Sequence, residues 1–362
     1  MKFYYTIFLF LFYFTSNACL WDRDTYAMEK QRFPEAYELI TGNFIRHSKA
    51  YYEWRISKIQ PLLDKGSKNP KLYDDLAVAY SKLHNDKKAI SLMLEKDKFA
   101  PGLYETYANL GTFYIHDGQF EMGLIYIDKA IFKNPDAHFG REIYQRYLVE
   151  FVIAQGKNAS KYSNFYYFLV TKYNEKHKKK ETSLPLDEVK KATKGVLGMM
   201  RFGNFNSPIL LNALGDILVN EEYEEEKNAL RLGAMAYMAA ELYSEKRISK
   251  TLEEKINSFL NLQEEGLNNF EKLQMELISS IRKGEKIYGI IEENESKWVA
   301  ENANLDAKFA EKFYDLSTLK NEKATLTTVY EQFTLFDKFN VLYVFLAVFS
   351  LGILYLIYRY KK

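Results

Sequence analysis

The chain has 362 residues, 47% of them hydrophobic, and its formal net charge of +2 at pH 7 argues against a general nucleic-acid-binding protein. The single cysteine, Cys19, excludes an internal disulfide and a cysteine-based zinc site. With 7 prolines, 17 glycines and almost no strand signal, the chain is predicted to be all-α.

The N-terminal residues 1–18 are predicted to be a secretory signal peptide. Lys2 supplies the positive start, residues 3–14 form an uncharged and almost wholly apolar run, and small residues precede Cys19. The apolar run is too short to span a membrane comfortably, so cleavage is favoured over an uncleaved anchor. Ser-Asn-Ala-Cys also resembles a degenerate bacterial lipobox, which leaves lipidation of Cys19 as an alternative.

Residues 19–69 are predicted to form a helical cap or a divergent repeat, with helices over residues 34–44 and 48–63. Charged side chains and two tryptophans are concentrated in this segment. A buried ion-pair network is the favoured interpretation, and a ligand- or metal-binding site is the alternative. The residues of this alternative ligand cluster are Asp22, Asp24, Arg46, His47 and Arg55.

Residues 70–172 contain repeats with the period of a helical hairpin. Pro101 and Pro135 lie 34 residues apart, and the aligned repeats begin at Pro70 and Tyr104. Proline cannot continue a helix, so each proline is expected to follow the second helix of a hairpin. Small residues occupy the eighth and twentieth positions, where the two helices approach closely. They are Ala77, Ala89, Gly111 and Gly123.

The two repeats resemble the tetratricopeptide (TPR) family over about residues 70–137. The resemblance implies a TPR-like α-solenoid of stacked helix pairs, with the first helix of each pair on the concave face. It also implies that a partner peptide contacts certain positions of these first helices. This set is mixed in sign and lacks the cationic clamp of TPR domains that bind acidic C-terminal peptides. The implied peptide-binding residues are Lys71, Asp74, Val78, Glu105, Asn109, Thr112 and His116.

The repeat pattern weakens after the second hairpin. Residues 139–172 are predicted to form a third hairpin, and the lysine-rich segment 173–186 a solvated linker rather than a basic docking loop. A divergent helical repeat is predicted over residues 187–245, in which Ser207 caps a helix and Pro208 occupies its first turn.

The C-terminal part combines long charged helices with a membrane segment. Residues 249–337 are predicted to be helical, and the first helix is expected to end at Gly284. Residues 339–358 carry no formal charge, and at about 1.5 Å per residue they reach roughly 30 Å, the thickness of a hydrocarbon core. Basic residues lie in 359–362, so we predict one transmembrane helix followed by a cytoplasmic tail.

A wider resemblance covers the N-terminal segment. Blocks at residues 21–25, 32–34, 46–48 and 51–55 resemble uncharacterised bacterial membrane-anchored TPR proteins, a resemblance that implies a fold and no mechanism. With the two ends of the chain, it implies a bacterial protein held in the cell inner membrane by a single pass. The signal peptide would place the body on the periplasmic side.

The sequence shows no pattern typical of catalysis. The five histidines lack metal-ligand spacing, and neither a glycine-rich phosphate loop nor a nucleophile elbow occurs. We therefore expect no enzymatic activity, no cofactor and no metal. The predicted function is a scaffold or adaptor that binds a protein or peptide partner. The alternatives are a sensor or enzyme that uses the N-terminal cluster, and a structural spacer whose groove is empty.

Overall fold

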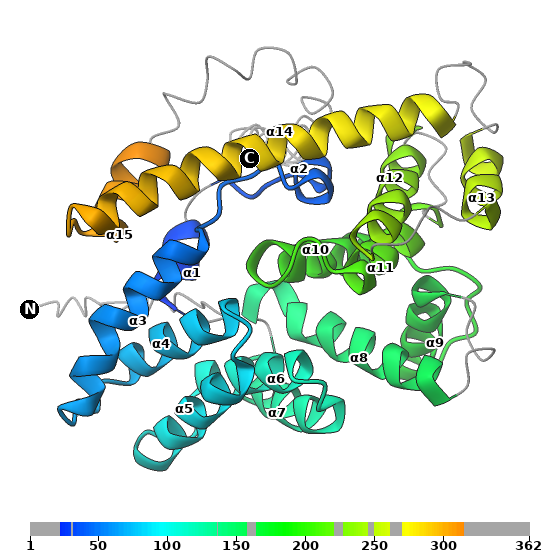
Figure 1. Ribbon diagram of the computed structural model, residues 1–362. Helices are drawn as coiled ribbons and strands as arrows, with labels where there is room; N and C mark the ends of the chain where they lie inside the picture. The colour runs from blue at the N-terminus through cyan, green and yellow to red at the C-terminus, as the bar shows by residue number, and fades with distance from the viewer. Residues whose placement is uncertain are drawn as a thin grey trace, which may run out of the picture. The chain divides into compact units, whose positions relative to one another are not determined.

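The structure, a computed structural model, describes residues 22–29, 32–135, 137–157, 164–220, 227–244, 250–260 and 270–314. Every element in these ranges is helical and none is a strand, as the all-α prediction requires. Figure 1 shows the helices along the chain. They are α1 (Arg23–Glu29), α2 (Ala36–Thr41), α3 (Lys49–Asp64), α4 (Pro70–Lys82), α5 (Asp86–Phe99), α6 (Tyr104–His116), α7 (Phe120–Lys133), η1 (Ala137–Gly140), α8 (Arg141–Lys157), α9 (Phe165–His177), α10 (Leu186–Phe202), α11 (Pro208–Leu218), α12 (Lys227–Tyr243), α13 (Lys250–Leu260), α14 (Phe270–Ala300), α15 (Leu305–Phe309) and a π-helical turn, Ala310–Tyr314.

The chain divides into two compact units, Met1–Leu305 and Asp306–Lys362. The described part of the second unit is short, and it consists of most of α15 and the π-helical turn. The candidate site described below lies entirely within the first unit.

The hairpins α4–α5 and α6–α7 have the predicted register. Ala77 and Ala89 are fully buried between α4 and α5. A Cβ atom on Gly111 would lie 2.7 Å from the Ile127 side chain, and one on Gly123 would lie 2.7 Å from Ile115. The close approach of α6 and α7 therefore requires glycine, which explains why the eighth and twentieth positions carry small residues.

Helix starts follow the expected capping chemistry. The Asn69 side chain accepts a hydrogen bond from the Lys71 amide, with Pro70 in the first turn of α4. The Ser207 side chain accepts from the Leu210 amide at the start of α11, as predicted. A side-chain acceptor satisfies one of the free amides that every helix leaves at its N-terminus.

The helices of the first unit pack around two hydrophobic cores. One core is built from α3, α4, α5 and α6, whereas the other is built from α2 and the helices from α8 to α14. Adjacent helices α2 and α3 thus belong to different cores, and the short segment between them, residues 42–48, runs from one core to the other.

Helix α14 joins the last part of the first unit to its start, because it packs on α2, α3 and α12 (Figure 1). The prediction that a helix ends at Gly284 is wrong, since α14 continues to Ala300. A Cβ on Gly284 would lie 2.6 Å from the Thr41 carbonyl oxygen and 2.7 Å from the Gly42 backbone. Glycine is needed here for close packing on the end of α2, not to terminate a helix.

Two other boundaries differ from the sequence prediction. Helix α9 extends to His177, so the predicted linker 173–186 is shorter at its start and its first residues are helical. Lys178 follows with a positive φ of 54°, the left-handed conformation that ends the helix. The first charged helix predicted from residue 249 corresponds to α13 and part of α14, and residues 261–269 between them lie outside the described ranges.

The predicted signal peptide (residues 1–18), Cys19 and the predicted transmembrane helix (residues 339–358) also lie outside the described residues. Among the helices that are described, none combines the length and apolar character needed to cross a membrane.

Candidate functional site: a cavity between the two cores

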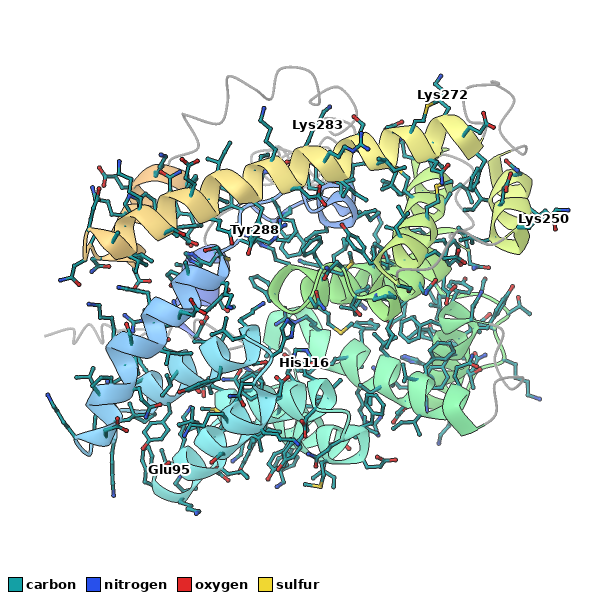
Figure 2. All side chains as sticks on the ribbon, in the orientation of Figure 1. Glu95, His116, Lys250, Lys272, Lys283 and Tyr288 are labelled. Atoms are coloured by element: carbon teal, nitrogen blue, oxygen red, sulfur yellow. The ribbon has the colours of Figure 1, made fainter. Side chains whose placement is uncertain are left out.

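A cavity of about 1040 Å³ lies between the two cores of the first unit. Its walls come from the C-terminal ends of α4, α6 and α10, from α8, from the segment 41–49 and from α14. Figure 2 labels two lining residues, His116 at the end of α6 and Tyr288 on α14, which are far apart in the sequence. The volume is slightly above the range of about 300–1,000 Å³ typical of small-ligand pockets.

Arg46 lies where the segment between α2 and α3 meets α14. Its guanidinium carbon is 4.4 Å from the centroid of the Phe205 ring and 4.5 Å from that of Tyr288, and Nη1 donates a 2.6 Å hydrogen bond to the Gly42 carbonyl. Burial lowers the pKa of the Arg46 guanidinium. These contacts hold a half-buried cation at the cavity wall.

Two further cations bind the carbonyl groups at the end of α10. Lys82 Nζ donates to the carbonyls of Phe202 and Gly203 at 2.7 and 2.8 Å, and Arg141 Nη1 donates to the Gly198 carbonyl at 3.2 Å. The last carbonyls of a helix lack intrahelical partners and carry the negative end of its dipole. The end of α10 therefore attracts Lys82 from α4, and Arg141 from α8 binds a carbonyl one residue before the last four of the helix.

Aromatic rings connect these cations into a row. The Phe44 ring centroid lies 5.2 Å from the guanidinium carbon of Arg46 and 5.1 Å from that of Arg201. The Phe202 centroid lies 5.9 Å from Arg201 and 5.2 Å from Arg141. Arg201 Nη1 also donates to the carbonyl of residue 45 at 2.7 Å. We call Arg46, Lys82, Arg141 and Arg201 the cationic wall.

Glu295 on α14 fixes the segment that carries Arg46. Its carboxylate accepts a hydrogen bond from the Ser48 backbone amide at 2.8 Å and contacts His47 Nδ1 at 2.5 Å. The side chains of His47 and Glu295 are 2% and 0% exposed. A carboxylate at the start of α3 also matches the positive end of that helix. A residue 247 positions later in the chain thereby caps α3.

A second buried group continues from His47 into α3. The His47 and Tyr51 rings are stacked with centroids 3.4 Å apart, Arg55 contacts the Tyr51 hydroxyl, and Arg55 forms an ion pair with Asp22. The side chains of Arg55 and Asp22 are each 1% exposed. The structure therefore shows a buried ion-pair network here, with its charges directed at each other.

The structure divides the alternative ligand cluster. Asp22 and Arg55 are buried in the network, whereas Arg46 and His47 line the cavity. The side chain of Asp24 lies outside the described residues. No group of three or more potential metal-binding His, Cys, Asp or Glu residues occurs in the described part of the chain. A ligand site made of all five residues is therefore not what the structure shows.

The implied peptide-binding residues fall into three groups. Thr112 and His116 line the cavity. Asp74, Val78 and Asn109 are 4%, 2% and 0% exposed, so the prediction that these three face an open groove is wrong. Their positions on the first helices are covered by neighbouring helices. The remaining two residues, Lys71 (exposed) and Glu105 (half-buried), are not part of the cavity lining.

Asp74 is part of a buried pair inside the first hairpin. Both of its carboxylate oxygens lie 2.7 Å from Lys96 Nζ, and the Asn109 side-chain amide donates to Oδ1 at 3.2 Å. Burial raises the pKa of Asp74 to about 7 although Lys96 opposes this shift. The residues Asp74 and Asn109 thus bind each other and Lys96, in place of a peptide.

A Ser–His–Asp group at the cavity edge lacks the geometry of a catalytic triad. The Ser81 hydroxyl donates to Asp86 at 2.5 Å, and His116 Nδ1 lies 3.4 Å from that hydroxyl and 3.6 Å from the same carboxylate oxygen. In a triad the histidine accepts the serine proton through one ring nitrogen and donates to the carboxylate through the other. Here Ser81 and Asp86 share one nitrogen, and the serine proton is directed at Asp86.

Sequence reasoning missed Arg141 and Arg201 as members of the site. Each was visible as a basic residue at a helix end, Arg141 at the start of α8 and Arg201 in the last turn of α10. Position alone, however, does not reveal that the two side chains meet around Phe202.

Comparison with known proteins gives no relative: no family model, no curated protein and no solved structure matches the chain.

Proposed function

We propose that the protein is an exported, membrane-anchored adaptor whose TPR-like stack of helix pairs binds a segment of a partner protein in the cavity. The observation that carries the proposal is that Thr112 and His116, from a repeat hairpin, and Arg46 and His47, from the N-terminal segment, line one cavity. The proposal assigns no catalytic step to the site.

The mixed character of the lining supports a peptide segment as occupant. Apolar side chains such as Ile115, Leu148 and Phe205 lie beside basic ones. Pockets that bind ligands combine apolar contacts with a few polar groups that fix orientation. The periodic hairpins α4–α5 and α6–α7 support the solenoid interpretation, since stacked helix pairs create concave binding surfaces.

Site-specific photo-crosslinking in intact membranes tests partner binding. A photoreactive phenylalanine analogue would replace Ile209 or His116, which are exposed residues of the cavity lining. The control position is Phe132 on α7, which is 87% exposed and outside the lining. We expect one partner to be captured from both cavity positions and not from residue 132. Equal capture at all three positions, or none at the cavity, would contradict the proposal.

Membrane attachment is tested separately. The predicted span, residues 339–358, is uncharged and followed by basic residues, which supports an anchor with the body outside the cytoplasm. Deletion of residues 339–362 is expected to release the protein from membranes into the periplasmic fraction. Protease added to spheroplasts is expected to digest the body of the intact protein. A body that resists protease until the inner membrane is broken would show the opposite topology.

A further inference from the structure

Five consecutive exposed residues at the end of α9 include four lysines and no acidic side chain. They are Lys176, His177, Lys178, Lys179 and Lys180, and we call them the lysine turn. The whole chain is nearly neutral, with 50 basic and 48 acidic residues, so this concentration of one charge is local. Like charges on neighbouring side chains repel each other, and an anionic surface against them would relieve that repulsion.

The backbone of the lysine turn is fixed by Asn174. The side-chain oxygen of Asn174 accepts a hydrogen bond from the Glu181 amide at 2.9 Å, and its side-chain amide donates to the Glu181 carbonyl at 2.8 Å. The Asn174 carbonyl accepts from the Lys179 amide at 3.1 Å, and Lys178 has the left-handed conformation with a φ of 54°. The segment therefore folds back on α9 as an ordered turn, which presents its lysines together.

The carboxylates nearest to the turn in the sequence are paired with other lysines or with one end of the turn. Glu175 lies 3.4 Å from Lys172 Nζ, and Glu181 lies 3.7 Å from Lys179 Nζ. Exposed pairs of this kind contribute little energy and are easily exchanged. Three lysines of the turn form no ion pair with a described residue: Lys176, Lys178 and Lys180. Their charges are therefore available to a partner.

Two features favour a flat anionic surface over a small anion or a peptide as the partner. A cavity beside Lys176 has a volume of about 10 Å³, which is room for about one water molecule. All four cations of the turn are lysine, a hydrated point charge, whereas arginine is preferred for paired hydrogen bonds to one carboxylate or phosphate. A bilayer rich in anionic lipid presents many negative charges and requires no pocket.

We propose that the lysine turn docks the body of the protein on the anionic phospholipid surface of the membrane that holds its anchor. This second membrane contact goes beyond the proposed function, and it takes from that proposal only the anchor at residues 339–358. It makes the segment after α9 a docking surface, in place of the solvated linker that the sequence favours. A single anchoring span leaves the orientation of the body undetermined, and a charged docking point restricts it.

Fluorescence quenching in lipid nanodiscs tests the docking on the full-length protein. Cys19→Ser removes the natural thiol, and Thr182→Cys, at an exposed position beside the turn, carries a nitrobenzoxadiazole fluorophore. The discs contain phosphatidylcholine alone or an equimolar mixture with phosphatidylglycerol, and both include a lipid with a spin label on its headgroup. We expect strong quenching only in the anionic discs, because each lysine near an anionic surface favours attachment by about fivefold.

Charge reversal tests whether the attachment arises from the turn. The variant Lys176→Glu, Lys178→Glu, Lys180→Glu should lower the ratio of attached to detached protein by more than about a hundredfold. Replacing the same three lysines by arginine should keep the attachment, since the charge is retained. The control variant makes the first change at three exposed lysines near the α3–α4 turn: Lys65→Glu, Lys68→Glu and Lys71→Glu. We expect no effect of the control, and helical circular dichroism checks that each variant folds.

Salt supplies a measurement that needs no variant. Raising the ionic strength from about 0.1 M to about 1 M shortens the Debye length from about 10 Å to about 3 Å, so quenching should fall. Equal quenching in both kinds of disc, or equal effects of the two charge-reversal variants, would overturn the inference. Quenching in neither kind of disc would also overturn it and would leave an acidic protein as the occupant of the turn.

Failure of the proposed anchor has a different signature. A protein that enters neither kind of disc contradicts the anchor, and the docking is then measured by flotation of the same variants with vesicles of the two compositions. Partner binding is tested independently, because a partner captured at Ile209 and not at Phe132 supports the proposed function whatever the lysine turn binds.

Discussion

The hairpins α4–α5 and α6–α7 share one register yet stabilise it with different chemistry. At the fifth and twenty-seventh positions of the repeat, the first hairpin has the buried ion pair Asp74–Lys96, with side chains 5% and 1% exposed. The second hairpin has Ala108 and Ala130 at these positions, which are 4% and 0% exposed. Both positions are buried in each hairpin, and only the residues at these positions differ.

This difference shows that the position of a residue in the repeat dictates whether its side chain is buried, but not which type of residue stands there. Burial follows from the geometry of the hairpin, which is set by the small residues at the eighth and twentieth positions. A charged residue at a buried position therefore needs a buried partner, and Asp74 finds one in Lys96. The twelfth and thirteenth positions, by contrast, line the cavity in both hairpins; they are Ser81, Lys82, Ile115 and His116.

The largest expected effect comes from breaking the ion pair. Asp74→Ala leaves the ammonium of Lys96 buried without its counter-charge, so we expect a loss of about 3–5 kcal/mol in the free energy of unfolding. Urea unfolding followed by helical circular dichroism measures this loss.

The double variant Asp74→Ala, Lys96→Met is the matched control, because it makes the first hairpin apolar like the second. We expect it to be at least about 2 kcal/mol more stable than Asp74→Ala. If the double variant is no more stable than the single one, the loss comes from packing rather than from an uncompensated charge.

A smaller effect is expected where the second hairpin is packed more closely than the first. Gly111→Ala would place a Cβ atom 2.7 Å from the Ile127 side chain and 3.1 Å from its backbone nitrogen. We expect about 1–3 kcal/mol of destabilisation by overpacking, despite the better helix propensity of alanine. Ala77→Gly, the reverse change in the first hairpin, should cost about 1 kcal/mol. Stabilisation by Gly111→Ala in urea unfolding would show that the helices separate easily.

The smallest effects are expected at the fourth position, which is tyrosine in both hairpins. The Tyr73 hydroxyl donates to Glu95 at 2.7 Å, whereas Tyr107 receives Lys129 Nζ over its ring, 5.5 Å from the centroid. Figure 2 labels Glu95 on α5. Tyr73→Phe should cost about 1 kcal/mol, and Tyr107→Phe less than about 0.5 kcal/mol because the ring is kept. Equal losses in urea unfolding would mean that the Tyr73 hydrogen bond contributes nothing specific.

Much of the secondary structure could be predicted because its signals are local. The period of the small residues identified both hairpins, and the pair Ser207–Pro208 identified the start of α11. Gly284 was misinterpreted, since a glycine in a charged helix looks like a stop whether it ends the helix or allows close packing. The contact with Thr41 that explains it comes from a segment more than 200 residues earlier.

The candidate site was predicted only in pieces. The repeat pattern places Thr112 and His116 in a groove and the N-terminal charges place Arg46 and His47 in a separate cluster, but neither pattern predicts the cavity that all four line. The cationic wall in particular has no sequence pattern. It assembles because carbonyl groups in the last two turns of α10 accept hydrogen bonds from basic side chains of α4 and α8, which are distant in the sequence.

The sequence by itself determined the helical class and the bounds of two helical hairpins, because both depend on the spacing of residues close together in the chain. Tertiary structure alone decided which charged side chains form buried ion pairs and which charged side chains line the cavity. The pair His47–Glu295, separated by 248 positions, shows the reason. A contact between distant segments leaves no periodic trace in either one, although it fixes the segment that carries Arg46.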